Sequence, residues 1–555
     1  MEFCPPTRDA RLVQMRTISS RTWIYVVVSA ALQILIFPLA GPLSAWPAAL
    51  SWIALAPWMA ALLLRGKAGL PIGFLDAAVL SYLCGILWYL GNCYWIYQTM
   101  YLYGGLPRPA AIIILVLFAL YLGLYHCLFG VLFALAQRTR LGSFGALLAA
   151  PFLWVSVELA RARITGFPWD LLGYSQVNNL FLTRLAPLAG VMALSFVLSA
   201  VNATLVPLLL PVWRKYIPLA LAAFVLAVAG QLAGQLPTFK LGARRQATQT
   251  ATMMQENLLV GEAARGSKPL SDAEEMALFS RWSENPLHHR DDGAWRFNSE
   301  SQQPDVIVWP EAPSNLQSDD PLFRQEVGQL ARSAGSVVIA GSLGVDAAPS
   351  VPRGYYLYDS ASLFAADGTY QSRYDKIHLV PWGEYVPFKA LFSFAKKLTA
   401  GVGDMDRGRK RTVFRSGGHS YGVFICYESI FGDEVRQFVA NGADVLVNIS
   451  DDGWYGDTGA PWQHLNMARM RAIENHRWLL RSTNTGVTTA IDPRGRIAFS
   501  APRHVRAAFS FPFDFVSNET FYTRHGDWFA WLCVLIALGF VGAALSPATR
   551  SKQID

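Results

Sequence analysis

The segment Gly422-Val-Phe-Ile-Cys-Tyr-Glu428 is an apolar run of strand type that ends at a thiol, Cys426. Its apolar, β-branched and aromatic residues are typical of a buried strand. A cysteine in such a strand is most often only a small hydrophobe. Cys426 stands where the run gives way to polar residues, however, and side chains at such ends often line functional sites. The segment therefore predicts a buried strand with a candidate nucleophile at its end.

The regions that flank this strand differ strongly in composition. Of the 555 residues, 53% are hydrophobic and only 15% are charged, which indicates a membrane protein with a soluble part. About eight apolar stretches are long enough to cross roughly 30 Å of hydrocarbon. They lie near residues 22–40, 46–64, 72–97, 109–136, 144–160, 185–211, 217–236 and 528–545. We therefore predict a transmembrane domain at 1–237, an outer domain at 238–527, and a last span with its tail at 528–555.

Basic residues in the short loops predict the orientation of these spans. Alternate loops carry Arg65 and Lys67, Arg138 and Arg140, and Arg214 and Lys215. The positive-inside rule places these loops, and both termini, in the cytoplasm. Arg161, Arg163 and Arg184 lie on the opposite side and argue mildly against it. The formal charge of +8 fits cytoplasmic loops beside anionic lipid, so no nucleic-acid partner is expected.

This orientation places Cys426 outside the cytoplasm, where no second cysteine is expected to form a disulfide bond with it. The other cysteines lie in the N-terminal tail or in and beside the spans, at Cys4, Cys84, Cys93, Cys127 and Cys533. An unpaired thiol on an oxidising side of a membrane is a liability unless it is deeply buried or chemically employed. The cysteine pattern alone leaves both possibilities open.

Short β-rich runs alternate with helical patterns in the outer domain, which predicts a layered α/β domain. The expected strands are 306–309, 336–340, 356–364, 421–426, 445–449, and a hairpin of 487–491 with 497–500. The expected helices are 322–334 and 462–477. No Cys pair or His-Glu-x-x-His motif is present, so neither a metal site nor another cofactor is expected.

Two further residues stand beside strand-type segments and complement the thiol. Glu311 follows the strand 306–309 and Pro310, and Lys376 begins an apolar run that continues to Pro387. Each residue alone is most often solvated. Together they meet the needs of Cys426, because the ammonium of Lys376 favours the thiolate and Glu311 can accept its proton. We expect Lys376 and the backbone N–H of Tyr427 to stabilise an oxyanion during attack on a carbonyl group.

These residues resemble the Glu-Lys-Cys triad of the nitrilase superfamily, and the added spans resemble the apolipoprotein N-acyltransferase family over nearly the whole chain. Six short motifs occur in the order of that family. They are Trp309-Pro-Glu311, His378-Leu-Val-Pro-Trp-Gly-Glu384, Cys426-Tyr-Glu428, Asp452-Gly-Trp-Tyr-Gly456, Pro461-Trp-Gln-His464 and Arg481-Ser-Thr-Asn484. The resemblance implies a membrane helical bundle joined to a nitrilase-like α-β-β-α sandwich.

The resemblance also implies a two-step reaction in a bacterial inner membrane, with the outer domain in the periplasm. Cys426 would take a fatty acyl group from a phospholipid as a thioester. The N-terminal α-amine of an S-diacylglyceryl-cysteine on an apolipoprotein would then take the acyl group. Glu311 would serve as base and Lys376 as the cation. Supporting roles are implied for Glu384, which would orient Lys376, and for Tyr427, Glu428 and Trp454. A monomer is expected.

The chain also departs from the family pattern. Glu256 stands where the family more usually has Gly, and Asp359 where it usually has Asn. The segment Phe388–Lys397 carries aromatic residues and lysines, which suits an interfacial lid over the thioester.

Two rival functions remain at this level. Gly418-His-Ser420-Tyr-Gly422 matches a serine-hydrolase motif, but a strand rather than a helix follows it, so a lipase that uses Ser420 is disfavoured. A transporter or receptor is the second rival, because Asp76, His126 and Glu158 lie in or near spans.

Overall fold

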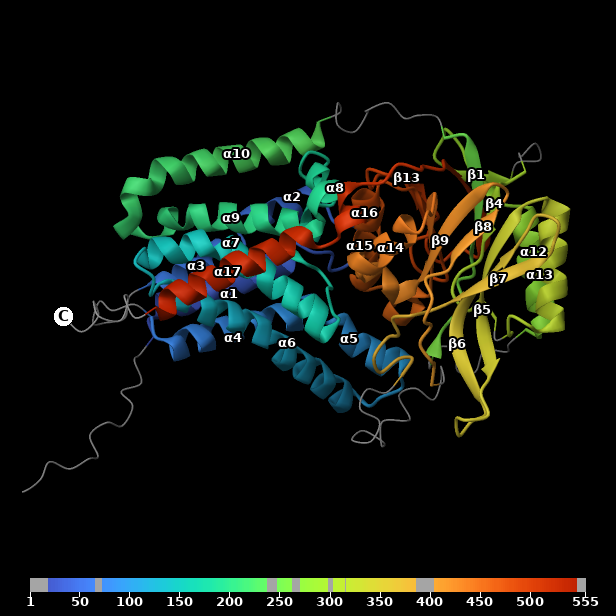
Figure 1. Ribbon diagram of the computed structural model, residues 1–555, viewed down its shortest axis with the longest axis horizontal. Coiled ribbons are helices and arrows are strands. Elements are labelled where there is room, and N and C mark those ends of the chain that lie inside the picture. Colours follow the sequence, from blue (N-terminus) through green and yellow to red (C-terminus); the bar gives the residue numbers. More distant parts are fainter. Residues whose placement is uncertain are drawn as a thin grey trace, which may run out of the picture.

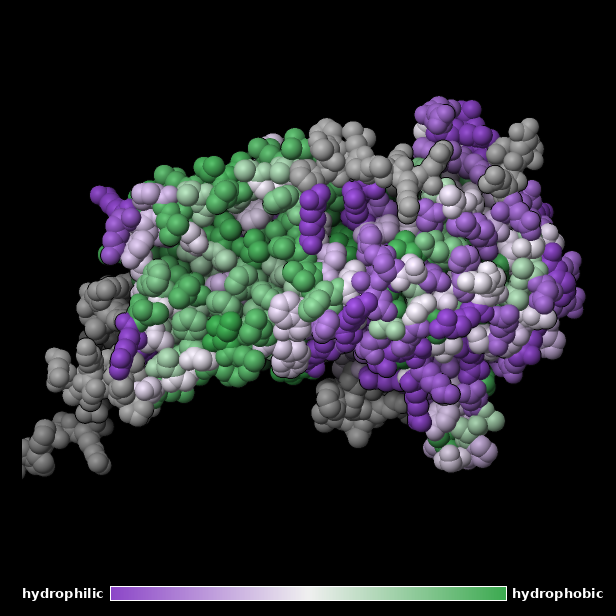
Figure 2. All heavy atoms as spheres, turned by 45° about the horizontal axis from the view of Figure 1, so that its top comes forward, coloured by the Kyte–Doolittle hydropathy of each residue, from purple (hydrophilic) through white to green (hydrophobic). Residues whose placement is uncertain are grey.

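Long apolar helices form one half of the molecule and a β-rich domain forms the other (Figure 1). The computed structural model describes residues 18–64, 72–236, 247–261, 270–297, 303–314, 316–385 and 404–546. Within these ranges seven helical segments are long and apolar enough to cross a membrane, and α1 (Ser20–Leu35) is a shorter apolar helix. Hydrophobic residues dominate the visible face of this half, whereas polar residues dominate that of the β-rich half (Figure 2). The predicted membrane bundle is confirmed.

The helices of the bundle coincide with the predicted apolar stretches. The spanning segments are α2, η1 and α3 (Ala45–Leu63), α4 (Phe74–Asn92), α6 (Arg108–Ala136), α7 (Gly142–Ala160) with η3 (Arg161–Thr165), α9 (Val191–Leu209), α10 (Ile217–Gln235) and α17 (Trp528–Leu545). Short helices connect them: α5 (Trp95–Gln98), η2 (Thr99–Tyr103), η4 (Leu172–Gln176), η5 (Leu182–Leu185), α8 (Ala186–Ala189) and η6 (Pro211–Tyr216).

The described basic loops gather at the end of the bundle that lies far from the β-rich domain. Arg21, at the start of α1, donates a hydrogen bond of 2.9 Å to the carbonyl oxygen of Leu209 at the end of α9. Phe144, at the start of α7, stacks on Tyr216 in the α9–α10 connection. The start of α1, the α6–α7 loop and the α9–α10 connection therefore share one end of the bundle.

Two of the arginines at the opposite end have protein partners. Arg163 forms salt bridges with Asp433 and with Asp527, the latter at 2.5 Å. Arg161 is buried and donates a hydrogen bond of 2.7 Å to the hydroxyl of Tyr89. These contacts explain why basic residues occur beside the outer domain, where the positive-inside rule disfavours them.

Two sheets build the β-rich domain. The first has eight strands in the order β3-β2-β14-β1-β4-β5-β6-β7, and the second has six in the order β13-β12-β11-β10-β9-β8. The first contains β1 (Gln249–Gln255), β2 (Leu287–His289), β3 (Trp295–Phe297), β4 (Val306–Val308), β5 (Val337–Ala347), β6 (Tyr355–Phe364), β7 (Tyr370–Asp375) and β14 (Ala507–Phe513). The second contains β8 (Val413–Ser416), β9 (His419–Ile425), β10 (Val445–Ser450), β11 (Leu479–Thr483), β12 (Thr489–Ile491) and β13 (Ile497–Ser500).

Side-chain alternation along the strands produces four layers. In β4, Val306 and Val308 belong to a core shared with the second sheet, whereas Ile307 and the following Trp309 pack with α12 (Asp272–Glu284) and α13 (Pro321–Ala334). Successive strand residues point to opposite faces, so an unbroken apolar run is covered on both sides. Helices α14 (Gly432–Ala440) and α15 (Ala460–Asn475) cover the second sheet and lie between it and the bundle (Figure 1). The α-β-β-α order is confirmed.

The predicted strands and helices of the outer domain are all present, with one difference that matters for the site. The strand that was expected to include Cys426 ends at Ile425, and Cys426 begins the short helix η9 (Cys426–Ile430). The φ angle of Cys426 is 47°, in the left-handed region. A strand cannot continue through that conformation, so the thiol leaves the plane of the sheet.

Candidate active site

The residues Glu311, Lys376 and Cys426 come together in the structure. Each follows a strand, namely β4, β7 and β9. The Nζ atom of Lys376 lies 2.7 Å from Oε1 of Glu311, and the charges of both groups act on the pKa of the Cys426 thiol. All three side chains are buried, with Lys376 fully buried. Residues far apart in the sequence therefore form one cluster between the two sheets.

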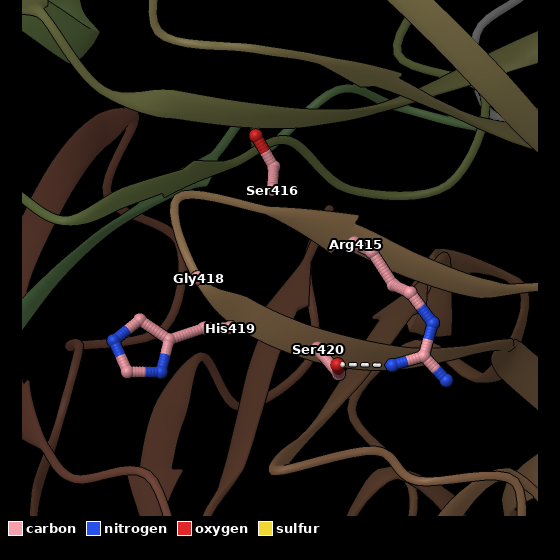
Figure 3. A pocket seen from close by; sticks show the side chains of 5 residues that line it. All are labelled: Arg415, Ser416, Gly418, His419 and Ser420. Atoms are coloured by element: carbon pink, nitrogen blue, oxygen red, sulfur yellow. Dashed lines mark hydrogen bonds between the residues drawn. The ribbon is translucent and has the colours of Figure 1, made fainter.

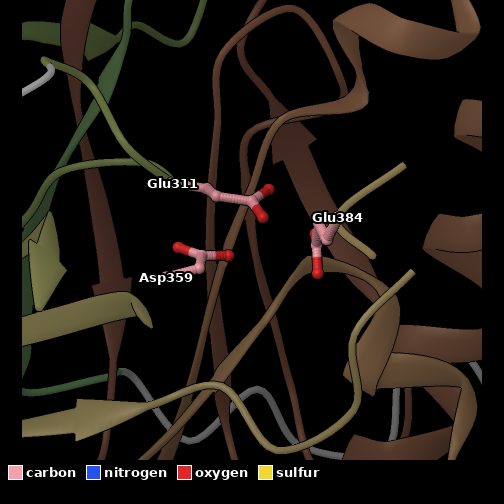
Figure 4. A group of neighbouring side chains, drawn as sticks. All are labelled: Glu311, Asp359 and Glu384. Atoms are coloured by element: carbon pink, nitrogen blue, oxygen red, sulfur yellow. The ribbon is translucent and has the colours of Figure 1, made fainter. Parts of the chain in front are cut away.

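The ammonium of Lys376 is surrounded by three carboxyl groups. Its Nζ donates to Glu311, to Oδ2 of Asp359 at 2.9 Å and to Oε1 of Glu384 at 2.6 Å. Figure 4 shows the three acidic side chains converging from separate segments. Their oxygens lie within 4.8 Å of one another, a spacing that suits a metal ion, but the ammonium already supplies the cation. Burial alone would lower the pKa of Lys376, yet these carboxyl groups raise it well above its usual value.

Glu311 is held as an ionised base. Its Oε1 accepts from Lys376, and its Oε2 accepts the backbone N–H of Asp451 at 2.6 Å. Burial would raise the pKa of Glu311, but the ammonium of Lys376 lowers it below its usual value. Both oxygens have donors, which fixes the carboxylate beside the thiol.

Cys426 is a protonated thiol in this site. Burial and the negative charge of Glu311 raise the pKa of the thiol well above its usual value, and Lys376 offsets only part of the increase. Lys376 favours the thiolate, as expected, but its charge does not outweigh burial and the charge of Glu311. Glu311 has to remove the proton as the sulfur attacks.

Glu428 connects the segment of Lys376 to that of Cys426. Its Oε2 accepts the backbone N–H of Ile425 at 2.8 Å, and its Oε1 accepts that of Ile377 at 2.7 Å. The side chain is fully buried. A carboxylate that accepts backbone donors from both segments fixes their spacing, so Glu428 acts on the site through the backbone.

Tyr427 and Trp454 lie where the outer domain meets the bundle. The hydroxyl of Tyr427 donates to the carbonyl oxygen of Gly166 at 3.0 Å. Thr99 donates a hydrogen bond of 2.9 Å to the carbonyl oxygen of Trp454, in η10 (Asp452–Tyr455). These bonds hold the loops around the nucleophile against membrane-domain segments. The expected lid, Phe388–Lys397, lies outside the described residues.

Sequence reasoning missed a buried histidine network behind the nucleophile. The Nε2 atom of His464 lies 2.6 Å from the hydroxyl of Ser429 and 3.0 Å from the carbonyl oxygen of Cys426. Its Nδ1 lies 2.8 Å from Asp452, which also accepts from Arg481 at 2.7 Å. His464, Asp452 and Arg481 each belong to one of the family motifs quoted above, and this was the only signal of them in the sequence. Nothing in the one-dimensional pattern showed that they surround Cys426.

The structure does not support Ser420 as a nucleophile. Its hydroxyl accepts a hydrogen bond of 3.0 Å from Arg415, in a surface pocket of about 330 Å³ (Figure 3). The adjacent His419 stacks on Phe515, with ring centroids 3.6 Å apart, so it is not placed as a base for Ser420. Six residues of extended β9 place Ser420 about 20 Å from Cys426.

The ionisable groups of the bundle are used in its packing. His126 is buried and hydrogen-bonds to Gln33 at 3.2 Å. Glu158 accepts from Trp154 and from the backbone N–H of Leu172. Asp76 lies in the first turn of α4, where its negative charge interacts favourably with the positive end of the helix dipole. Structural roles therefore account for the features that suggested a transporter.

Comparison with known proteins identifies relatives of both halves. A family model described as carbon-nitrogen hydrolase matches residues 292–506, and one described as apolipoprotein N-acyltransferase N-terminal domain matches 29–204. A protein of Geobacter metallireducens named apolipoprotein N-acyltransferase is 34% identical over 99% of both chains. Proteins with that name from Methylococcus capsulatus and Vibrio cholerae are 32% and 30% identical, over 86% and 92% of this chain and 89% and 96% of theirs.

Two solved structures are similar to about half of this chain. Yeast Nit3 is 16% identical, with a TM-score of 0.34, and the match covers 49% of this chain and 93% of Nit3. An amidase from Nesterenkonia is 17% identical, also with a TM-score of 0.34, over 51% of this chain and 94% of the amidase.

Proposed function

The chain belongs to the apolipoprotein N-acyltransferase family, and from this membership we propose a two-step acyl transfer by Glu311, Lys376 and Cys426. The protein is a membrane-embedded acyltransferase that acts in lipoprotein maturation, with phospholipid and lipoprotein substrates. The observation that carries the mechanism is the buried Glu311–Lys376 pair, 2.7 Å apart, whose charges both act on the thiol of Cys426.

In the first step Glu311 takes the thiol proton of Cys426 while the sulfur attacks the acyl ester carbonyl of a phospholipid. A C–S bond forms and the ester C–O bond breaks. The lysophospholipid alkoxide takes the proton back from Glu311 and leaves. The acyl group remains on Cys426 as a thioester.

In the second step the N-terminal α-amine of an S-diacylglyceryl-cysteine attacks the thioester. A C–N bond forms and the C–S bond breaks. Glu311 accepts a proton from the amine and returns one to the sulfur, which restores the thiol. Thioester to amide is downhill, so the cycle needs no nucleotide.

Each step develops a negative oxygen, and we assign its stabilisation to the backbone N–H of Tyr427 and the ammonium of Lys376. The three N–H donors of Lys376 are engaged with Glu311, Asp359 and Glu384 in the substrate-free site. An oxyanion therefore gains a direct bond to Lys376 only in exchange for one of these contacts.

We further propose that residues 238–527 are periplasmic, that both termini are cytoplasmic, and that the protein acts as a monomer in the inner membrane. The clustering of the described basic loops at one end of the bundle supports the orientation. The membrane-embedded parts are then the transmembrane domain at 1–237 and the last span with its tail at 528–555.

Intact mass spectrometry of the full chain after exposure to phospholipid alone tests the mechanism. Wild type should gain the mass of one fatty acyl group, which hydroxylamine removes, and Cys426→Ala should gain none. Ser420→Ala is the matched control and should acylate like wild type. A Cys426→Ala variant that still becomes acylated, or a Ser420→Ala variant that does not, contradicts the proposal.

A further inference from the structure

The carboxyl groups around Lys376 differ in how their oxygens are bonded. Glu311 has donors at both oxygens, from Lys376 and from the backbone of Asp451. Glu384 also has two, from Lys376 and from the backbone N–H of Val380 at 3.0 Å. Asp359 accepts from Lys376 at Oδ2 only, and its buried Oδ1 receives no donor from any described residue.

The charges of the cluster do not balance if every acid is ionised. One ammonium would face three carboxylates, all of them buried. An ionised oxygen without a donor in such a place costs several kcal/mol. A proton on one of the acids removes part of this excess, and the bonding pattern identifies Asp359 as the acid that carries it. An oxygen of Asp359 also lies within 4.8 Å of one of Glu311, which is an acceptor for such a proton.

We propose that Asp359 is a neutral carboxylic acid that donates a hydrogen bond to Glu311 and so positions the base of the acyl transfer. This assignment rests on the proposed function of Glu311. Asp359 does not touch the substrate in this scheme. Its hydrogen bond keeps Glu311 ionised and directed toward Cys426. Its neutrality also limits the negative charge of the site, where further negative charge develops on the sulfur and on the carbonyl oxygen during the reaction.

The neutral state also makes Asp359 the weakest acceptor of Lys376. An ammonium binds a carboxylate more strongly than it binds a neutral acid. When an oxyanion forms, Lys376 can therefore replace its hydrogen bond to Asp359 by one to the oxyanion with the smallest loss of free energy. The same residue would then hold the base and leave one donor of Lys376 available.

The proposal predicts a loss of activity at alkaline pH. Burial and the charges of Glu311 and Glu384, against the attraction of Lys376, raise the pKa of Asp359 well above its usual value. Below that pKa the proton is present and the hydrogen bond to Glu311 is intact. As pH rises through it, a second negative charge appears beside Glu311 and the acylation rate falls.

Other titratable groups face this pair and have to be separated from it. Glu384, Lys376 and Cys426 belong to the cluster, and Asp451 faces Glu311 from the loop after β10. Burial and the charge of Glu311 raise the pKa of Asp451 to about 7. Its titration is common to wild type and to variants of Asp359, so it cancels in their comparison.

The test uses full-length protein and the phospholipid half-reaction alone, followed by intact mass spectrometry from mildly acidic to alkaline pH. Asp359→Asn keeps a neutral donor, so its rate at neutral pH should stay within several-fold of wild type, and its alkaline decline should disappear or move to higher pH. Asp359→Ala removes the donor and should lower the rate about 10²-fold through misplacement of Glu311. Asp346→Asn is the matched control, because Asp346 is exposed and paired with Arg373.

Infrared difference spectroscopy provides a readout that a purely structural role would not change. The difference spectrum of wild type minus Asp359→Asn should contain the carbonyl stretch of a protonated buried carboxyl group, and that of wild type minus Asp346→Asn should lack it. Absence of this band from the Asp359→Asn difference spectrum, or identical pH profiles for Asp359→Asn and wild type, overturns the proposal. The band does not depend on acyl transfer, so it distinguishes failure of this proposal from failure of the thioester mechanism.

Discussion

Lys376 is the residue on which the charge balance of the site depends. It is fully buried, and its three contacts with carboxyl groups are 2.6–2.9 Å long. Such a group gains little net stability from being paired, because burial removes it from water. Its removal is costly, however, since the carboxylates then remain buried without a cation.

We therefore expect Lys376→Met to lose both stability and activity. The free energy of unfolding should fall by about 3–5 kcal/mol, as for other broken buried ion pairs. Acylation by phospholipid should fall at least about 10³-fold, because the base loses its orientation and the oxyanion a donor. Thermal unfolding and intact mass spectrometry measure the two effects.

Lys410→Met is the control for this change. Lys410 is an exposed lysine of the same domain, and its substitution should change the free energy of unfolding by less than about 0.5 kcal/mol. A Lys376→Met variant that unfolds and acylates like the Lys410 variant would show that the buried ammonium is dispensable.

At the scale of elements, the turn from β9 into η9 aims the nucleophile. The left-handed conformation of Cys426 costs about 1–2 kcal/mol for a residue other than glycine. The His464 ring on α15 bonds to the carbonyl oxygen of Cys426 and to Ser429 of η9. Helix α15 thus holds the strained turn from behind.

His464→Phe tests this arrangement. Phenylalanine retains an aromatic ring, which in the native protein stacks on Trp169, but it removes both ring nitrogens. The acylation rate should fall about 10²-fold because the thiol is misplaced. Chains that do react should still carry one acyl group each. Quenched time courses read by mass spectrometry measure the rate.

His525→Phe provides the comparison, because His525 is an exposed histidine of α16 (Phe521–His525). It should acylate at the wild-type rate. If both variants behave alike, His464 has no role in positioning Cys426.

Some of these elements were predictable from the sequence because apolar alternation and strand-end polar residues carry a local signal. β4 is a continuous apolar run, β9 and β10 are largely apolar, and Glu311 stands just past the end of β4. The prediction does not include β2 and β3, because three residues are too few for a periodic pattern, and it also lacks β7, β8 and β14. The left-handed turn at Cys426 was also missed, since a cysteine gives no sign of it.

The surroundings of the site depend on which segments become neighbours, and this could not be read from the sequence. Asp359 was visible only as a departure from a family pattern, and its contact with Lys376 follows from the pairing of β6 with β7. His464 meets Cys426 because α15 packs on η9. Buried polar groups are chosen by their three-dimensional partners, so they leave little periodic trace.

At the scale of the molecule, the two halves are joined through charged and polar contacts that fix their relative placement. Arg163 links η3 to Asp433 and Asp527, and Glu474 of α15 accepts the backbone N–H of Val191 at 2.9 Å. These contacts hold the outer domain against the end of the apolar bundle, an arrangement that suits substrates anchored in a bilayer.

Thiol labelling tests the proposed orientation. Arg138→Cys lies in the α6–α7 loop, and Asp457→Cys lies on the exposed surface of the outer domain. A reagent that cannot cross the inner membrane should label Asp457→Cys in cells with a permeabilised outer membrane, and Arg138→Cys only after lysis. The unmodified chain gives the background from native thiols. The reverse labelling pattern would invert the topology.

The position of β14 has a consequence for biogenesis. This strand comes from residues 507–513, near the end of the outer domain, yet it pairs with β1 on one side and with β2 on the other. Until the ribosome has made it, β2 and β3 have no link to the remainder of their sheet. In the proposed topology, a nascent chain therefore exports almost the entire domain in an unfinished state, and the last span inserts just after the strand that completes the fold.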